Sequence, residues 1–175
     1  GFGHAGLSAC AVMQRQPEPE LMDAAEQAAA YAQADFSAPH QFLVDRIRDA
    51  LPKLPAVARV LDLGCGPADV SLRFARAFPG WQIDGVYGAE AMLQLGRAQV
   101  AAAGLAARVR LHRVLLPSDP LPGAGYQLIL SNSLLHHLHE PAIFWRALQE
   151  AGRPGAAVLV MDLFRPTSVA AAAAL

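Results

Sequence analysis

The stretch VLDLGCGPADV, Val60 to Val70, decides the fold. An apolar run leads into two closely spaced glycines, which predicts a strand that enters a tight turn and continues as a helix. Because glycine has no Cβ atom, Gly64 and Gly66 can adopt positive φ and let a ligand lie against the backbone. In an open α/β sheet such a turn lies at the carboxyl end of a strand, where ligands bind. The stretch therefore predicts an α/β fold with a ligand site at this turn.

The chain from Ala58 onward alternates short apolar runs with amphipathic patterns, as expected for βαβ units around a parallel sheet. The segment Leu115–Gly125 contains three prolines and two glycines and is expected to be a loop. We expect Gly104 and Gly152 to end helices as C-terminal caps. The expected strands are Arg59–Leu63, Trp81–Tyr87, Arg108–Val114, Tyr126–Asn132 and Ala156–Phe164, and the expected helices are Val70–Phe78, Glu90–Ala103 and Pro141–Ala151.

Two helices are expected before the sheet. The first spans Pro19–Ala34, and the second begins at Ser37 as its N-cap and places Phe42, Leu43, Ile47 and Leu51 on one face. We expect residues 1–12 to be a leader before a natural start at Met13, residues 13–57 to form a helical lid, residues 58–165 the cofactor-binding core, and residues 166–175 the start of a truncated segment. The last strand would then be an exposed apolar edge. We expect further C-terminal strands or a second copy in a homodimer to cover it.

Composition narrows the class of partner. With 175 residues, 54% hydrophobic residues and a formal net charge of -1, the chain can bury one core and has no basic excess. Nucleic acids and membranes are therefore not expected as partners, and a small molecule is. The two cysteines, Cys10 and Cys65, have no zinc-site spacing, which favours a reducing, cytoplasmic setting. No apolar run is long enough to span a membrane, and no metal site is expected.

Two ligand classes use a glycine turn after a first strand. The dinucleotide fingerprint needs a third glycine where this sequence has Asp69, so that pattern fails and a nucleoside cofactor is favoured. A serine hydrolase is disfavoured because no G-x-S-x-G motif occurs.

VLDLGCGPADV resembles the first motif of class I S-adenosylmethionine-dependent methyltransferases, in the small-molecule group. IDGVYGAEAMLQLGRAQ is similar to that family's second strand and helix, GYQLILSNSLLHHLHEPAIFWRALQE to its fourth strand and the helix after it, and GRPGAAVLVMDLF to the turn and strand that follow. The resemblance runs from about Glu18 onward. It implies a doubly wound, Rossmann-like parallel sheet of order 3-2-1-4-5, an N-terminal helical lid, and S-adenosylmethionine as cofactor.

The resemblance also implies roles for individual residues. Asp62, Gly64, Cys65 and Gly66 would face the methionine part of the cofactor, Tyr87 the ribose, Gly88 and Met92 the adenine, and Asn132 the sulfonium, while Tyr31, Asp35 and Phe36 would belong to the lid. For Met92 and Phe36, packing in the core is an equally good interpretation.

Four positions depart from the family pattern. Tyr87 stands in place of the ribose-binding acid, and a phenol cannot accept from both hydroxyls as a carboxylate does. Ala68 replaces a frequent glycine, which would be a mild change if the residue is already helical. Leu115 stands near the position of an acid for the adenine, and Gln127 replaces an aspartate at the start of the fourth strand.

Methyl transfer from a sulfonium needs the acceptor to be positioned and water to be excluded, so no catalytic triad is expected. His136 or His137 would be the base for a hydroxyl or amine acceptor. Asp119, Glu140 and Asp162 are interpreted as isolated surface acids. The alternatives are a degenerate methyltransferase-like domain that binds cofactor or partners without turnover and, less favoured, an NAD-type oxidoreductase.

Overall fold

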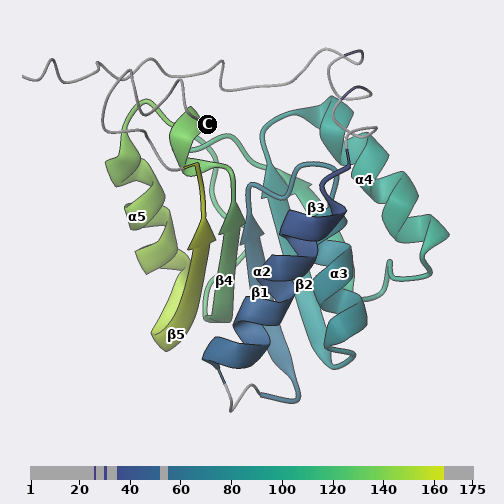
Figure 1. The fold of residues 1–175 in the computed structure, drawn as a ribbon. Coiled ribbons are helices and arrows are strands. Elements are labelled where there is room, and N and C mark those ends of the chain that lie inside the picture. The colour runs from purple at the N-terminus through teal and green to yellow at the C-terminus, as the bar shows by residue number, and fades with distance from the viewer. Residues whose placement is uncertain (1–25, 27–29, 31–34, 52–54, 164–175) are drawn as a thin grey trace, which may run out of the picture.

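A five-stranded parallel sheet forms the centre of the molecule (Figure 1). The computed structural model describes Glu26, Ala30 and residues 35–51 and 55–163. The strands lie in the order β3-β2-β1-β4-β5, which confirms the predicted doubly wound topology. In chain order the elements are α2 Ser37–Ala50, β1 Ala58–Leu63, α3 Asp69–Ala77, β2 Trp81–Tyr87, α4 Glu90–Ala102, β3 Val109–Arg113, β4 Tyr126–Asn132, the 3-10 turn η1 Leu135–His137, α5 Pro141–Ala151 and β5 Gly152–Met161.

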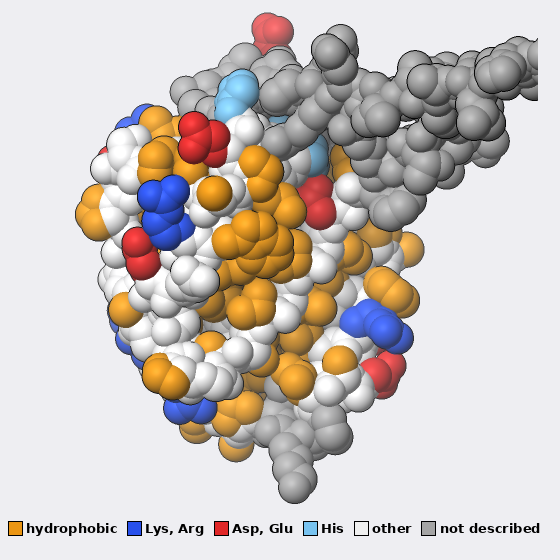
Figure 2. Space-filling model, turned by 90° about the vertical axis from the view of Figure 1, so that its left-hand side faces the viewer, with side chains coloured by type: hydrophobic (Ala, Val, Ile, Leu, Met, Phe, Trp, Pro, Cys, Tyr) orange, Lys and Arg blue, Asp and Glu red, His pale blue; other side chains and the backbone are white. Residues whose placement is uncertain are grey.

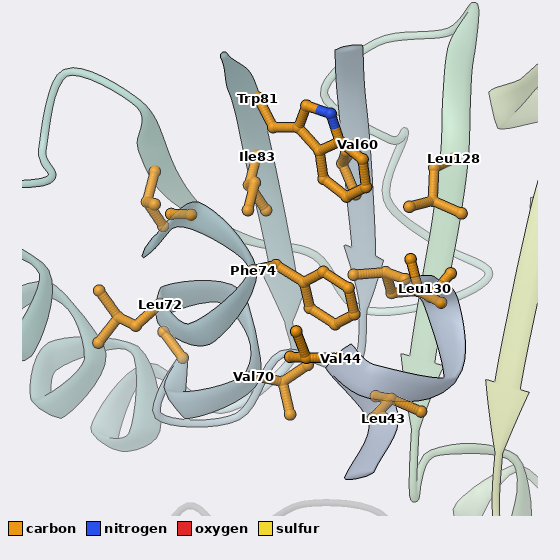
Figure 3. Close-up of a cluster of buried hydrophobic side chains, with 14 of the residues drawn as sticks. Leu43, Val44, Val60, Val70, Leu72, Phe74, Trp81, Ile83, Leu128 and Leu130 are labelled. Atoms are coloured by element: carbon orange, nitrogen blue, oxygen red, sulfur yellow. The ribbon is translucent and has the colours of Figure 1, made fainter. Parts of the chain in front are cut away.

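Different elements cover the two faces of the sheet. Helices α2, α3 and α4 bury one face, and α5 with the loop after β3 buries the other. On the first face Phe74 and Trp81 lie among aliphatic side chains of β1, β2 and β4 (Figure 3). The ring of Phe78 stacks on Trp81 at a centroid distance of 3.9 Å, which fixes the end of α3 on the start of β2. Because all neighbouring strands pair in parallel, their carboxyl ends lie at one edge of the sheet.

Most expected elements form within a residue or two of their predicted bounds, including the loop at 115–125. The last strand differs: β5 begins at Gly152 and ends at Met161, whereas Ala156–Phe164 was predicted. Gly152 ends α5 in an extended conformation, so the chain passes from helix to strand with no loop between them. Gly104 has a φ of +68°, as expected for a C-terminal cap.

Two predictions about α2 are wrong. Ser37 is the first helical residue and not the N-cap, and its backbone N–H donates to the Asp35 carboxylate at 2.9 Å. The Ser37 hydroxyl also donates to this carboxylate, and the side-chain and backbone hydrogen bonds together lower the pKa of Asp35. Phe42 is exposed, because the buried face of α2 runs through His40, Leu43, Val44 and Ile47. The helix therefore brings a histidine to the sheet that the sequence pattern did not indicate.

Other predictions fall outside what the structure describes. Residues 1–12, Tyr31 and most of residues 13–34 are not among the described residues, nor are residues 164–175. Within the described ranges, no helix is both long enough and apolar enough to cross a membrane. The cytoplasmic setting remains a prediction.

Candidate cofactor site

The turn after β1 has the geometry that its two glycines predict. Gly64 and Gly66 have φ values of +93° and +51°. A Cβ atom on Gly64 would lie 2.8 Å from Cβ of Leu134, whereas one on Gly66 would meet nothing within 4 Å. The backbone N–H groups of Gly64 and Cys65 both donate to the Val86 carbonyl at 3.0 Å, which fixes the turn to β2. Gly64 therefore serves packing, and Gly66 leaves open space beside the backbone.

Ala68 stands in the turn where the family pattern frequently has a third glycine. Ala68 has a φ of +69° and is fully buried, so the condition for a mild change, that this residue is helical, is not met. A left-handed alanine costs about 1–2 kcal/mol. Close packing comes instead from Gly96 on α4, where a Cβ atom would lie 3.1 Å from the carbonyl carbon of Pro67. The turn is thus held by a helix that is distant in sequence.

Asp62 lies on β1 just before this turn and is almost fully buried. Ser71 on α3 donates to its carboxylate at 2.5 Å. Burial raises the pKa of Asp62 to about 6, although the Ser71 hydrogen bond and the charge of His40 act in the opposite direction. The carboxylate is therefore partly protonated in mildly acidic solution and ionised above it.

Two cavities open at the carboxyl ends of the strands and share Phe36, His40, Gly64, Gly66 and Asn132. The first also contacts Asp62, Cys65, Asp69 and Arg73. The second, about 400 Å³, also contacts Tyr87, Met92, His136, His137 and Asp162. A ligand site of some 300–1,000 Å³ is usual for small molecules and cofactors. The shared residues make the two cavities one continuous candidate site.

Asn132 ends β4 where the two cavities meet. Its side-chain oxygen is buried and accepts no hydrogen bond from any residue that the structure describes. An unsatisfied buried acceptor costs about 1–3 kcal/mol, so a donor on a bound molecule would stabilise this end of the strand. Together with the open space at Gly66, this oxygen fits a polar ligand that crosses from one cavity to the other.

His136 is held by an acid that the sequence interpretation set aside. Nδ1 of His136 lies 2.7 Å from the Asp162 carboxylate, which also accepts from the backbone N–H of Leu135 at 2.7 Å. The ring of His137 lies 4.0 Å from that of His136. Asp162 follows β5 directly and is largely buried, so its interpretation as an isolated surface acid is wrong. The adjacency of β4 and β5 was the signal that places these two residues together.

A second histidine–aspartate pair, His40 with Asp69, links α2 to α3. Nδ1 of His40 lies 2.7 Å from an Asp69 carboxylate oxygen, and Nε of Arg73 donates to the same oxygen at 2.8 Å. Burial raises the pKa of Asp69, but the two hydrogen bonds, together with the charges of Arg73 and His40, outweigh burial and lower this pKa overall. Sequence reasoning missed His40 and Arg73, because neither lies in a recognisable motif.

The structure brings most of the predicted site residues together. Asp62, Gly64, Cys65, Gly66, Tyr87, Met92, Asn132, His136 and His137 line the joined cavity. Met92 also packs in a buried cluster with Ala89, so it serves the core as well. Gly88 lines neither cavity, and its carbonyl accepts from the Arg113 side chain at 3.2 Å. Burial raises the pKa of the Cys65 thiol, which disfavours a reactive thiolate there.

A parallel sheet of this order, with a glycine turn after its first strand and a cavity at the strand ends, is the class I S-adenosylmethionine-dependent methyltransferase fold. The chain belongs to the methyltransferase domain family, whose model matches residues 60–155.

Curated relatives agree with this family. An uncharacterized methyltransferase of Mycobacterium tuberculosis is 30% identical over 126 residues, which are 70% of this chain and 59% of that protein. Trans-aconitate 2-methyltransferase of Paracidovorax citrulli is 33% identical over 92 residues, which are 51% of this chain and 34% of that protein. The chain thus spans less than two thirds of these relatives.

Solved structures share the fold at low identity. A methyltransferase from Methanococcus maripaludis has a TM-score of 0.68 at 15% identity, covering 91% of this chain and 74% of that one. A second, from Thiobacillus denitrificans in complex with S-adenosyl-L-homocysteine, has a TM-score of 0.63 at 19% identity, covering 83% and 56%. These likenesses show the fold.

Proposed function

We propose that this chain binds S-adenosylmethionine in the joined cavity and transfers its methyl group to a small-molecule acceptor. The observation that carries the proposal is the single cavity at the strand ends, with open space at Gly66 and the unsatisfied oxygen of Asn132. Family membership supports the same cofactor. When bound, the cofactor would supply a methyl group carried on a sulfonium. The sulfur would keep the electron pair of the broken S–C bond and become a neutral thioether.

The chain's own residues would hold the two ends of this cofactor. Asp62 and the turn through Gly66 would face the amino-acid end in the first cavity. Tyr87 and Met92 would face the nucleoside in the second cavity. Phe36 and His40 of α2 line both cavities, which supports the proposal that this helix is part of a lid that excludes water.

His136 is the proposed base for an acceptor that loses a proton. The Asp162 carboxylate accepts from Nδ1, so the proton stays on that nitrogen and Nε2 is the basic atom. In an in-line transfer the acceptor atom gains the methyl group while its proton passes to Nε2 and then to solvent. Among its relatives, trans-aconitate 2-methyltransferase is named for its acceptor. For this chain we propose a small-molecule acceptor.

The second candidate is a domain that binds the cofactor without turnover. The observation that favours it is Tyr87, which lines the cavity where a carboxylate would pair with the ribose hydroxyls. Losing such a charged hydrogen bond costs about 1.5–3 kcal/mol, or roughly one to two decades of affinity. Product binding with no methyl transfer to any acceptor would support this second candidate.

A pair of glycine variants tests the cofactor site. Gly66→Ala and Gly104→Ala place alanine at φ values of +51° and +68°, with no atom within 4 Å of the new Cβ at either position. Both should therefore lower the free energy of unfolding by a similar amount, about 1 kcal/mol. Only Gly66→Ala should also weaken binding of S-adenosylhomocysteine, by about tenfold or more, because its methyl group enters the cavity.

The measurement is calorimetric titration of both variants and the wild type with S-adenosylmethionine, S-adenosylhomocysteine and NAD. Equal losses of affinity in the two variants would refute the placement of the cofactor at this turn. Binding of NAD alone would refute the proposed function.

A further inference from the structure

Arg73 on α3 is a cation beside the proposed amino-acid end of the cofactor. It lines the first cavity together with Asp62, Gly64 and Gly66. Nothing in the family resemblance assigned it a role. Any role of Arg73 in recognising a charged group of that cofactor rests on the proposed function.

The charges around the first cavity are unequal. Its described lining contains three carboxylates, Asp35, Asp62 and Asp69, and Arg73 is the only Lys or Arg side chain among those residues. The amino-acid end of the cofactor is a zwitterion that needs one partner of each sign. Buried Asp62 can accept from the ammonium group, and Arg73 is the available partner for the carboxylate.

The guanidinium of Arg73 is fixed before any ligand arrives. Nε donates to Asp69 at 2.8 Å, and the side chain is only 23% exposed. Its two terminal nitrogens carry further N–H groups, of which one reaches the Gln41 side chain at the long distance of 3.4 Å. A planar fork held at one edge presents its other N–H groups in a geometry that suits a carboxylate.

His40 positions this fork from the opposite side. Its Nδ1 lies 2.7 Å from the same Asp69 oxygen, and its ring stacks on Phe36 at a centroid distance of 5.6 Å. Because His40 shares the carboxylate charge with Arg73, less of that charge offsets the guanidinium. The histidine thus keeps Asp69 in place and preserves the attraction of Arg73 for an anion.

Part of the turn's backbone is already hydrogen-bonded. The N–H groups of Gly64 and Cys65 already donate to the Val86 carbonyl, and that of Ala68 donates to the Cys65 carbonyl at 2.9 Å. Pro67 has no N–H group. Those four turn residues therefore offer no unshared backbone donor to a carboxylate, and any backbone donor beside Arg73 would come from Gly66 or the first turn of α3.

We propose that Arg73, positioned by Asp69 and His40, binds the carboxylate of the cofactor's amino-acid end. The three residues come from α2 and α3, so this contact also joins the proposed lid helix to the bound cofactor. A ligand that has the nucleoside and the thioether but lacks the amino-acid end should not sense Arg73.

The experiment compares two ligands by calorimetric titration. S-adenosylhomocysteine carries the amino-acid end, and 5′-methylthioadenosine has the same nucleoside and thioether without it. Arg73→Gln should weaken the binding of S-adenosylhomocysteine by about ten- to a hundredfold and leave the affinity for 5′-methylthioadenosine unchanged. Arg76→Gln, an exposed arginine on the same helix, is the matched control and should change neither. Thermal unfolding of each variant checks that the fold persists.

His40→Gln supplies a second, independent readout. His40→Gln should weaken the binding of S-adenosylhomocysteine when Arg73 is present. It should cause no further loss of affinity in the Arg73→Gln variant, because His40 acts through Arg73. Unchanged affinity of Arg73→Gln for S-adenosylhomocysteine, or an equal loss for both ligands, would overturn the inference and leave the proposed function intact. No binding of S-adenosylhomocysteine to the wild type would overturn both.

Discussion

Asp62 is a residue at which a binding role and stability oppose each other. Its pKa of about 6 in the folded chain lies above the ordinary value of 3.8, chiefly because the side chain is buried. Between these two values the folded chain keeps a proton that the unfolded chain has lost. The free energy of unfolding therefore falls as the pH rises from about 4 to about 6, by roughly 3 kcal/mol for a shift of this size.

Asp62→Asn should remove this dependence. The amide oxygen can still accept from Ser71, so the hydrogen bond at 2.5 Å has a replacement. The free energy of unfolding of the variant minus that of the wild type should be about 3 kcal/mol larger at pH 7.5 than at pH 4. Urea unfolding at both pH values measures this difference. It should also bind S-adenosylhomocysteine more weakly at pH 7.5, because a neutral amide attracts an ammonium group less than a carboxylate does.

Asp45→Asn, which changes an exposed carboxylate on α2, is the control and should show neither effect. A stability difference between Asp62→Asn and the wild type that stays constant with pH would contradict the raised pKa. An unchanged affinity would contradict only the contact with the ammonium group.

At the scale of elements, the ends of β4 and β5 bring His136 and Asp162 together. Asp162 follows β5 and accepts hydrogen bonds from the backbone N–H of Leu135 and from Nδ1 of His136, both in η1. It therefore orders this turn and keeps the proton of the neutral His136 ring on Nδ1. Replacing it with asparagine would keep the size but lose the charge. An amide can donate as well as accept, so the Nδ1–H tautomer would no longer be enforced.

Asp162→Asn should therefore change the tautomer of His136. Long-range proton–nitrogen NMR spectra report this tautomer directly, and the measurement needs no methyl acceptor. The affinity for S-adenosylhomocysteine should stay within about twofold, because Asp162 is proposed to position a base and not to hold the cofactor. Glu140→Gln, an exposed acid at the start of α5, is the control. An unaltered His136 spectrum in Asp162→Asn would show that the carboxylate does not set the tautomer.

The sequence predicted the elements well and the contacts between them less well. Apolar periodicity and the glycine turn were sufficient for the strands, because those signals are local. The conformation of Ala68 was not predictable, since its positive φ follows from how the turn meets α3 and not from the residue itself. Likewise, the pairing of His40 with Asp69 depends on how α2 packs across α3, and side chains 29 positions apart share no local pattern.

For the whole molecule, the two edges of the sheet differ. β3 is a short edge strand that carries Arg110, His112 and Arg113, and charged side chains oppose pairing with another chain. β5 is longer and mostly apolar, and no described strand pairs with its outer side. Trp145 of α5 and Val158 of β5 are each about half exposed on this side, and Figure 2 shows apolar side chains gathered over it.

This edge leads to a prediction about association. We expect the 175-residue chain to self-associate through α5 and β5, so that its average mass in analytical ultracentrifugation rises with concentration. Val158→Lys places a charge on the 48% exposed side chain of the edge and should shift the chain toward monomer with little change in thermal unfolding. Val57→Lys, at a 73% exposed valine before β1, should leave association unchanged. A wild-type mass that stays monomeric at every concentration would show that this edge does not pair between copies, and an equal effect of both lysines would assign any association to net charge.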